Sequence, residues 1–113
     1  MRPNNLKDAF TLIAEFKRGQ MPPGGLINNE QIELLRLLCK DLLPTEKFAE
    51  IGLGQLIEKI ALADTEWNQK TQLVIDEFYV LRESGKSAEA RERQKIFLDK
   101  CPSAWYHSIV ESL

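Results

Sequence analysis

The side chains best suited to chemistry in this sequence are its single histidine, His107, and its two cysteines, Cys39 and Cys101. A cysteine nucleophile needs a base within hydrogen-bond reach and usually a third group that orients the base. Cys101 and His107 belong to different predicted helices on either side of Pro102, and they form no known motif. One histidine with two scattered cysteines does not make a zinc site either. We therefore predict no catalytic residue and no metal site.

Two glycine-containing segments resemble fragments of nucleotide-binding motifs. Residues 84–87 read Ser-Gly-Lys-Ser, but a phosphate-binding loop also needs a glycine at position 80, where Val80 stands, and a buried strand before it. Residues 52–54 read Gly-Leu-Gly, and Ile57 takes the place of the third glycine of the dinucleotide motif. We predict a plain helix-to-helix turn at 84–87 and no cofactor. Together with the missing catalytic motifs, this predicts that the protein is not an enzyme.

The charges of the chain are nearly balanced, with 15 basic and 17 acidic residues and a formal net charge of −2. A nucleic-acid-binding protein usually carries a basic excess or a basic face, because phosphate contacts need lysine and arginine. Between residues 82 and 100 the basic side chains alternate with acidic ones, which is typical of a solvent-exposed face with salt bridges. We do not expect nucleic acid to be the main partner.

Length and composition indicate one small globular domain that spans residues 1–113, since 43% of the residues are apolar and 28% are charged. No run approaches the roughly 20 apolar residues of a membrane span. The first 20 residues lack the apolar stretch of a signal peptide, and secreted chains of this size usually carry more cysteines. These features predict a cytoplasmic protein with no membrane association.

Apolar residues recur at helical spacing along nearly the whole chain. The first predicted helix runs from Asn5 to Gly19, and the Met-Pro-Pro-Gly-Gly segment at 21–25 follows as a loop. A second helix is predicted from residue 28 or 29 to Leu43, and its apolar residues cover most of its circumference. Such a helix must be surrounded by others, so we place it at the centre of the bundle. After Pro44, Thr45 is predicted to cap a third helix.

The second half of the chain is predicted to form three further helices. A break at Ala63–Asp64 begins the fourth helix, whose apolar residues recur at alternating spacings of four and three: Trp67, Thr71, Val74, Phe78 and Leu81. Gly85 ends this helix, and Ser87 caps a charged fifth helix that runs to about residue 100. Pro102 separates it from a short last helix capped by Ser103. The prediction is an all-α fold, a compact bundle of five to six mostly antiparallel helices.

Residues 71–104 carry several marks of a known helical repeat. These are two apolar residues of its first helix, its turn glycine, the alanine of its second helix and its final proline: Phe78, Leu81, Gly85, Ala90 and Pro102. In these positions the segment resembles one tetratricopeptide repeat, although Gln94 stands where the second helix of the repeat has an aromatic residue. The resemblance implies peptide or protein binding on a concave helical surface. A generic antiparallel helix pair remains the other interpretation.

The function predicted from these observations is a small non-catalytic domain that binds another protein, as an adaptor, inhibitor, immunity or chaperone-like regulator. The candidate binding residues are of types favoured at interfaces: Tyr79, Arg91, Arg93, Trp105 and Tyr106. One alternative is a nucleic-acid-associated regulator that uses the charged helix 88–100. Another is an enzyme whose site forms across subunits around Cys101 and His107. Homo-oligomerisation also remains open.

Overall fold

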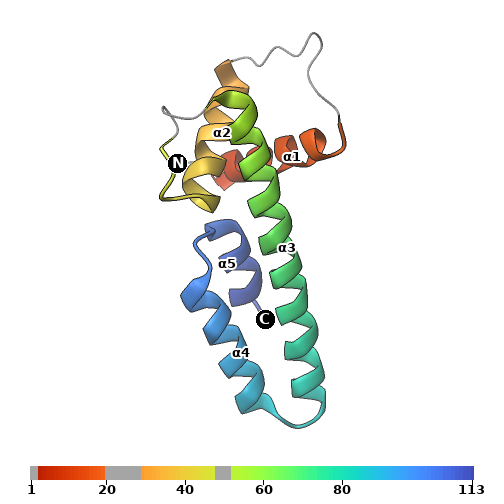
Figure 1. Cartoon of the computed structure of the whole chain (residues 1–113). Helices are drawn as coiled ribbons and strands as arrows, with labels where there is room; N and C mark the ends of the chain where they lie inside the picture. The colour runs from red at the N-terminus through yellow and green to blue at the C-terminus, as the bar shows by residue number, and fades with distance from the viewer. Residues whose placement is uncertain (1–2, 20–28, 48–51) are drawn as a thin grey trace. The chain divides into compact units, whose positions relative to one another are not determined.

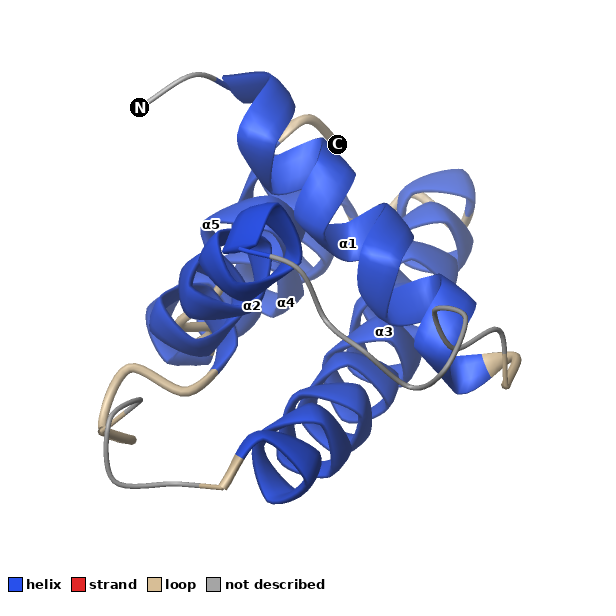
Figure 2. Ribbon diagram, turned by 90° about the horizontal axis from the view of Figure 1, so that it is seen from above, coloured by secondary structure: helices blue, strands red, loops and turns tan. Residues whose placement is uncertain are grey.

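The computed structural model describes residues 3–19, 29–47 and 52–113, and the regular structure in these ranges is entirely helical (Figures 1 and 2). The elements are α1 (Pro3–Lys17), α2 (Asn29–Leu42), α3 (Leu53–Glu83), α4 (Ser87–Lys100) and α5 (Ala104–Glu111). The predicted all-α class is confirmed. The chain divides into two compact units, residues 1–64 and 65–113, and α3 contributes to both. The single domain inferred from length and composition stays a prediction.

In the first unit, α1 packs against α2 through one apolar face of each helix. The buried apolar side chains of these two helices are Ala9, Phe10, Leu12, Ile13, Phe16, Leu35, Leu38, Cys39 and Leu42. The predicted end of the first helix at Gly19 is confirmed, since Gly19 has a φ of +78° and donates a hydrogen bond to the Phe16 carbonyl oxygen over 3.0 Å. The helix begins at Pro3 rather than Asn5, and proline suits a first turn because the N–H it lacks has no helical partner there.

The second helix occupies almost the predicted range, and within the first unit it packs through one face. Its fully buried residues lie on a single face of the helix. The side chains of Leu34, Leu37 and Leu43 are only half-buried. Within the first unit, α2 therefore packs as an amphipathic helix, and its place at the centre of a bundle stays a prediction.

The predicted break at Ala63–Asp64 is wrong, because α3 runs through it as one helix of 31 residues. The Asp64 carboxylate does not cap a new helix; its Oδ2 lies 2.9 Å from the Lys17 ammonium nitrogen, and the residue is only 6% exposed. Between Gln55 and Glu83 no glycine or proline interrupts the helix. Asp64, which local sequence predicted as a helix cap, therefore forms a tertiary ion pair instead.

The start of the third helix differs from the sequence prediction as well. Residues 44–46 form a turn, and the next described helix begins at Leu53, so Thr45 is not its cap. Phe48 and Ala49, which were expected on the buried side of that helix, lie outside the described residues, as does the predicted loop at 21–25.

In the second unit, Gly85 makes the turn that brings α4 alongside α3. Its φ is +77°, its N–H donates to the Arg82 carbonyl oxygen over 3.1 Å, and the Lys86 N–H donates to the Leu81 carbonyl oxygen over 2.8 Å. This is the hydrogen-bond pattern of a Schellman motif, which confirms the predicted role of Gly85. Ser87 is not the cap of α4, because Lys86 precedes the helix and contributes no capping side-chain hydrogen bond.

The short helix α5 is fixed to α4 by a buried side-chain hydrogen bond as well as by packing. Ser103 caps it as predicted, since its hydroxyl oxygen accepts a hydrogen bond from the Tyr106 N–H at 3.2 Å. The buried Gln94 donates from Nε2 to the carbonyl oxygen of Val110 over 2.9 Å. The position that carries an aromatic residue in a tetratricopeptide repeat thus holds a side chain that bonds α5. The helical hairpin exists, but the repeat itself is not confirmed.

Thr71 leads to the first testable prediction. It is buried in the second unit, and its hydroxyl oxygen has no hydrogen-bond partner within the described ranges. A buried hydroxyl without a partner costs free energy, so Thr71→Val should raise the free energy of unfolding by about 1 kcal/mol in urea titrations followed by circular dichroism. Thr11→Val is the matched control, because the exposed Thr11 hydroxyl already bonds the Lys7 carbonyl oxygen; its change should stay below about 0.5 kcal/mol. A loss of stability in Thr71→Val would contradict the assignment.

Candidate functional site

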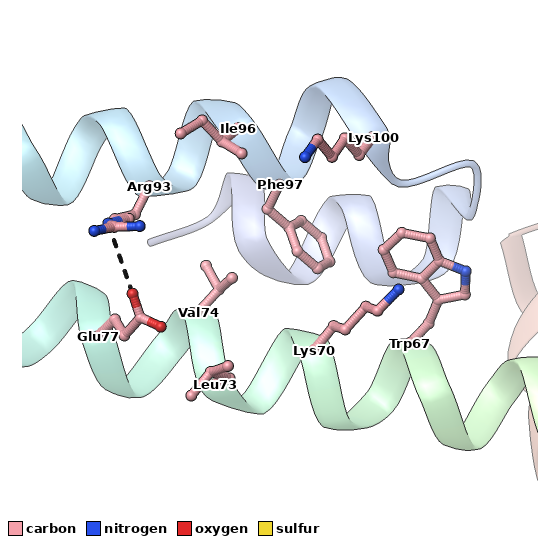
Figure 3. Close-up of a pocket in the computed structure, with 9 residues that line it drawn as sticks. All are labelled: Trp67, Lys70, Leu73, Val74, Glu77, Arg93, Ile96, Phe97 and Lys100. Atoms are coloured by element: carbon pink, nitrogen blue, oxygen red, sulfur yellow. Dashed lines mark ion pairs between the residues drawn. The ribbon is translucent and has the colours of Figure 1, made fainter.

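A groove between α3 and α4 in the described part of the chain is lined mostly by apolar surface. Its first pocket has a volume of about 300 Å³ and is lined by Trp67, Lys70, Leu73, Val74, Glu77, Arg93, Ile96, Phe97 and Lys100. In Figure 3, Val74 and Phe97 point toward each other between the two helices, while Leu73 and Ile96 lie at the outer rims. The Trp67 ring closes one end and meets the Phe97 ring edge to face, with the ring centres 5.7 Å apart.

Large apolar side chains of this groove are exposed to solvent. Leu73 is 59% exposed, Val80 is 64% exposed and Ile96 is 42% exposed. Leu73 and Val80 are seven residues apart, which places them on the same face of α3. Val80 and Leu81 line a second pocket of about 300 Å³ that shares Glu77 and Arg93 with the first. A single exposed leucine is ordinary in a folded protein, but here three large apolar side chains are exposed beside the two pockets.

Charged side chains divide the groove along its length. The Arg93 Nε atom lies 3.7 Å from the Glu77 Oε2 atom, so this ion pair crosses from α4 to α3 (Figure 3), and its two residues line both pockets. Both side chains are well exposed, and such a pair contributes little to stability. Its effect is to separate the two apolar pockets.

The two ends of the groove carry opposite charge. Lys70 and Lys100 line the pocket at the Trp67 end, and the Lys70 ammonium nitrogen lies 4.6 Å from the centre of the Trp67 ring. Asp76 lies beside Glu77 near the middle, and Glu89 and Glu92, which precede Arg93 in α4, line an adjoining hollow with Arg93 and Ile96. The groove is therefore basic at the Trp67 end and acidic toward the Gly85 turn.

The predicted candidate residues come together only in part. Arg93 lines the groove. Arg91 and Tyr79 both lie against Phe78, with the Arg91 guanidinium carbon 5.2 Å and the Tyr79 ring centre 5.8 Å from the centre of its ring. Arg91 also donates to the Gln94 side-chain oxygen and to the Leu113 carbonyl oxygen. Two of the arginines of the charged helix are thus already in contact with the chain itself.

The two aromatic candidates of α5 do not line the groove. Tyr106 is only 5% exposed and belongs to the core of the second unit. Trp105 is half-buried on the same helix. Sequence reasoning missed Leu73, Val80 and Ile96, which carry most of the exposed apolar surface of the groove. Leu73 and Val80 could have been found, because they repeat at seven residues outside the predicted apolar seam of their helix.

The residues first considered for chemistry lie outside the groove. Cys101 is buried, and its thiol donates to the Ser103 carbonyl oxygen over 3.6 Å. His107 is on α5, where its Nδ1 atom lies 3.4 Å from a carboxylate oxygen of Glu111. Cys39 is buried in the first unit. Burial raises the pKa of the Cys39 thiol, and the nearby Glu46 carboxylate raises it further. A thiol whose pKa is raised is a poor nucleophile at neutral pH.

Within residues 3–19, 29–47 and 52–113, no three histidine, cysteine, aspartate or glutamate side chains are placed to hold a metal ion together. The hollow between α1 and α2 is polar, and its charged lining is acidic: Asp8, Glu15 and Glu30. None of the described helices combines the length and apolar character that crossing a membrane requires. Comparisons with protein-family models, curated proteins and solved structures gave no significant match. The groove between α3 and α4 is therefore the candidate site.

The buried cysteines lead to a prediction about reactivity. Native Cys39 should react with a thiol-directed disulfide reagent at pH 8 at least about 100-fold more slowly than in urea, since the reaction requires local opening and a thiolate. Cys101→Ala isolates the signal of Cys39. Because the folded pKa is raised, the thiol form is favoured in the native state, and stability should fall as pH rises past the ordinary thiol pKa. A native rate equal to the unfolded one would show that Cys39 is accessible.

Proposed function

We propose that the chain is a small, non-catalytic, cytoplasmic domain that regulates another protein by binding it in the groove between α3 and α4. The observation that supports this most directly is the cluster of exposed apolar side chains, Leu73, Val80 and Ile96, beside two pockets. Covering them would remove apolar surface from water, which is the dominant favourable term in most protein association. The two free, buried cysteines support a reducing compartment.

The shape of the groove favours a helical partner segment. From Trp67 to Leu81 it follows α3 for 14 residue steps, or about 20 Å at 1.5 Å per residue. A partner helix of similar length would place apolar residues at i and i+7 into the two pockets on either side of the Glu77–Arg93 pair. Its remaining apolar positions would meet Leu73 and Ile96 at the rims.

The alternative of a nucleic-acid-associated regulator has less support. In α4, Arg93 pairs with Glu77, while Arg91 contacts Phe78 and Gln94. Glu89 and Glu92 line the same side of the helix as Arg93. Phosphate groups would meet these carboxylates, which raises the cost of a nucleic-acid contact there.

The proposed binding surface can be tested by affinity purification of a tagged chain from cells at several salt concentrations. Leu73→Gln combined with Ile96→Gln should remove stoichiometrically bound protein, because it replaces the apolar rims with amides. Leu62→Gln is the matched control: Leu62 is 63% exposed on the same helix but does not line the groove, so this variant should retain the partner.

Circular dichroism should show unchanged helicity in both variants, since all three side chains are exposed. Bound protein that survives the double substitution, or that is lost equally in Leu62→Gln, would contradict the assignment of this surface. Recovery of no stoichiometric protein by the unaltered chain at any salt concentration would contradict the proposed function itself.

A further inference from the structure

A second copy of the groove, turned end for end, has charges opposite to those of the first at both ends. Lys70 and Lys100 lie together at the Trp67 end (Figure 3), and the acidic residues Glu89 and Glu92, which precede Arg93 in α4, lie toward the Gly85 turn. Glu77 and Arg93 already pair across the middle. A second groove turned end for end would therefore present acid to base at both ends.

The exposed apolar residues have the form that this groove would accept. Leu73 and Val80 stand at i and i+7 on α3, so they make an apolar ridge along an exposed helix face. That is the spacing needed to reach two pockets separated by one ion pair. The chain thus carries both a groove for a helical ridge and such a ridge beside it.

We infer that the occupant of the groove is a second copy of this chain, which packs antiparallel so that α3 of one copy lies along α3 of the other. This inference rests on the proposed function, since it names the partner of the same surface. A two-fold axis across the helices, close to the Glu77–Arg93 pair, makes the interface isologous. Lys70 and Lys100 of each copy then face the acidic end of the other copy, and Leu73 of each copy lies near Val80 of the other.

The same charges argue against a partner with one dominant sign. The lining carries three basic side chains (Lys70, Arg93, Lys100) and four acidic ones (Asp76, Glu77, Glu89, Glu92), separated along the groove. A strongly acidic or strongly basic helix would be attracted at one end and repelled at the other, which lowers its affinity. A second copy in the antiparallel orientation meets opposite charge at both ends.

The test is the mass of the full chain in solution, measured by sedimentation and native mass spectrometry from micromolar to millimolar concentration. The unaltered chain should form a dimer, and Leu62→Gln should behave identically. Lys70→Glu with Lys100→Glu makes both ends of the groove acidic, whereas Glu89→Lys with Glu92→Lys makes both ends basic. Each double variant alone should dimerise at least about tenfold more weakly, since like charges then face each other.

Mixing the two double variants is the decisive step. Their grooves have opposite charge, so the mixture should restore a heterodimer, recognised when one variant carries a mass label. A chain that stays monomeric at millimolar concentration would overturn the inference, as would a dimer that both variants leave intact or a mixture that restores nothing. Loss of a different bound protein in Leu73→Gln/Ile96→Gln, with a monomeric unaltered chain, would overturn the second-copy inference and leave the proposed binding function standing.

Discussion

A seam of alternating four- and three-residue spacing on α3, whose side chains are buried or half-buried, is the constraint on which the second unit depends: Trp67, Thr71, Val74, Phe78 and Leu81. Phe78 is buried in this seam, and Trp67 meets Phe97 across it. Because successive residues of a helix are turned by about 100°, the residue just before each seam position points away from the packed face. Leu73 precedes Val74 and Val80 precedes Leu81, so the helix that forms the core necessarily presents these two residues outside it. The exposed ridge is a direct consequence of the register of the core.

Local chemistry predicted several joints of the fold correctly. Gly19, Gly85 and Ser103 occupy positions where a positive φ or a capping hydroxyl is needed within a few residues, and such requirements are visible in sequence. Asp64 shows where this reasoning fails. An aspartate that could cap a helix instead pairs with Lys17, which lies 47 positions earlier in the chain. A contact of that range leaves no local signal, so the continuity of α3 could not be predicted.

The candidate site was less accessible to sequence reasoning than the fold. Arginine and aromatic residues were chosen by type, yet type does not separate the core residue Tyr106 from the groove residue Arg93. Whether such a residue is buried or exposed depends on which face of α5 packs against α4. That face is set by contacts such as the Gln94 hydrogen bond to Val110. The seven-residue spacing of Leu73 and Val80 was the signal in the sequence that could have identified the groove. The apolar seam of α3 already supplies its buried face, so a further apolar pair outside the seam is expected to be exposed.

Photo-crosslinking inside the cell tests most directly whether this chain binds through the groove between α3 and α4. Benzoylphenylalanine would replace Leu73 in one variant and Leu62 in another, two leucines of α3 with similar exposure. Binding through the groove predicts a discrete adduct from position 73 and none from position 62. Adducts of equal yield from both positions, or from position 62 alone, would contradict it.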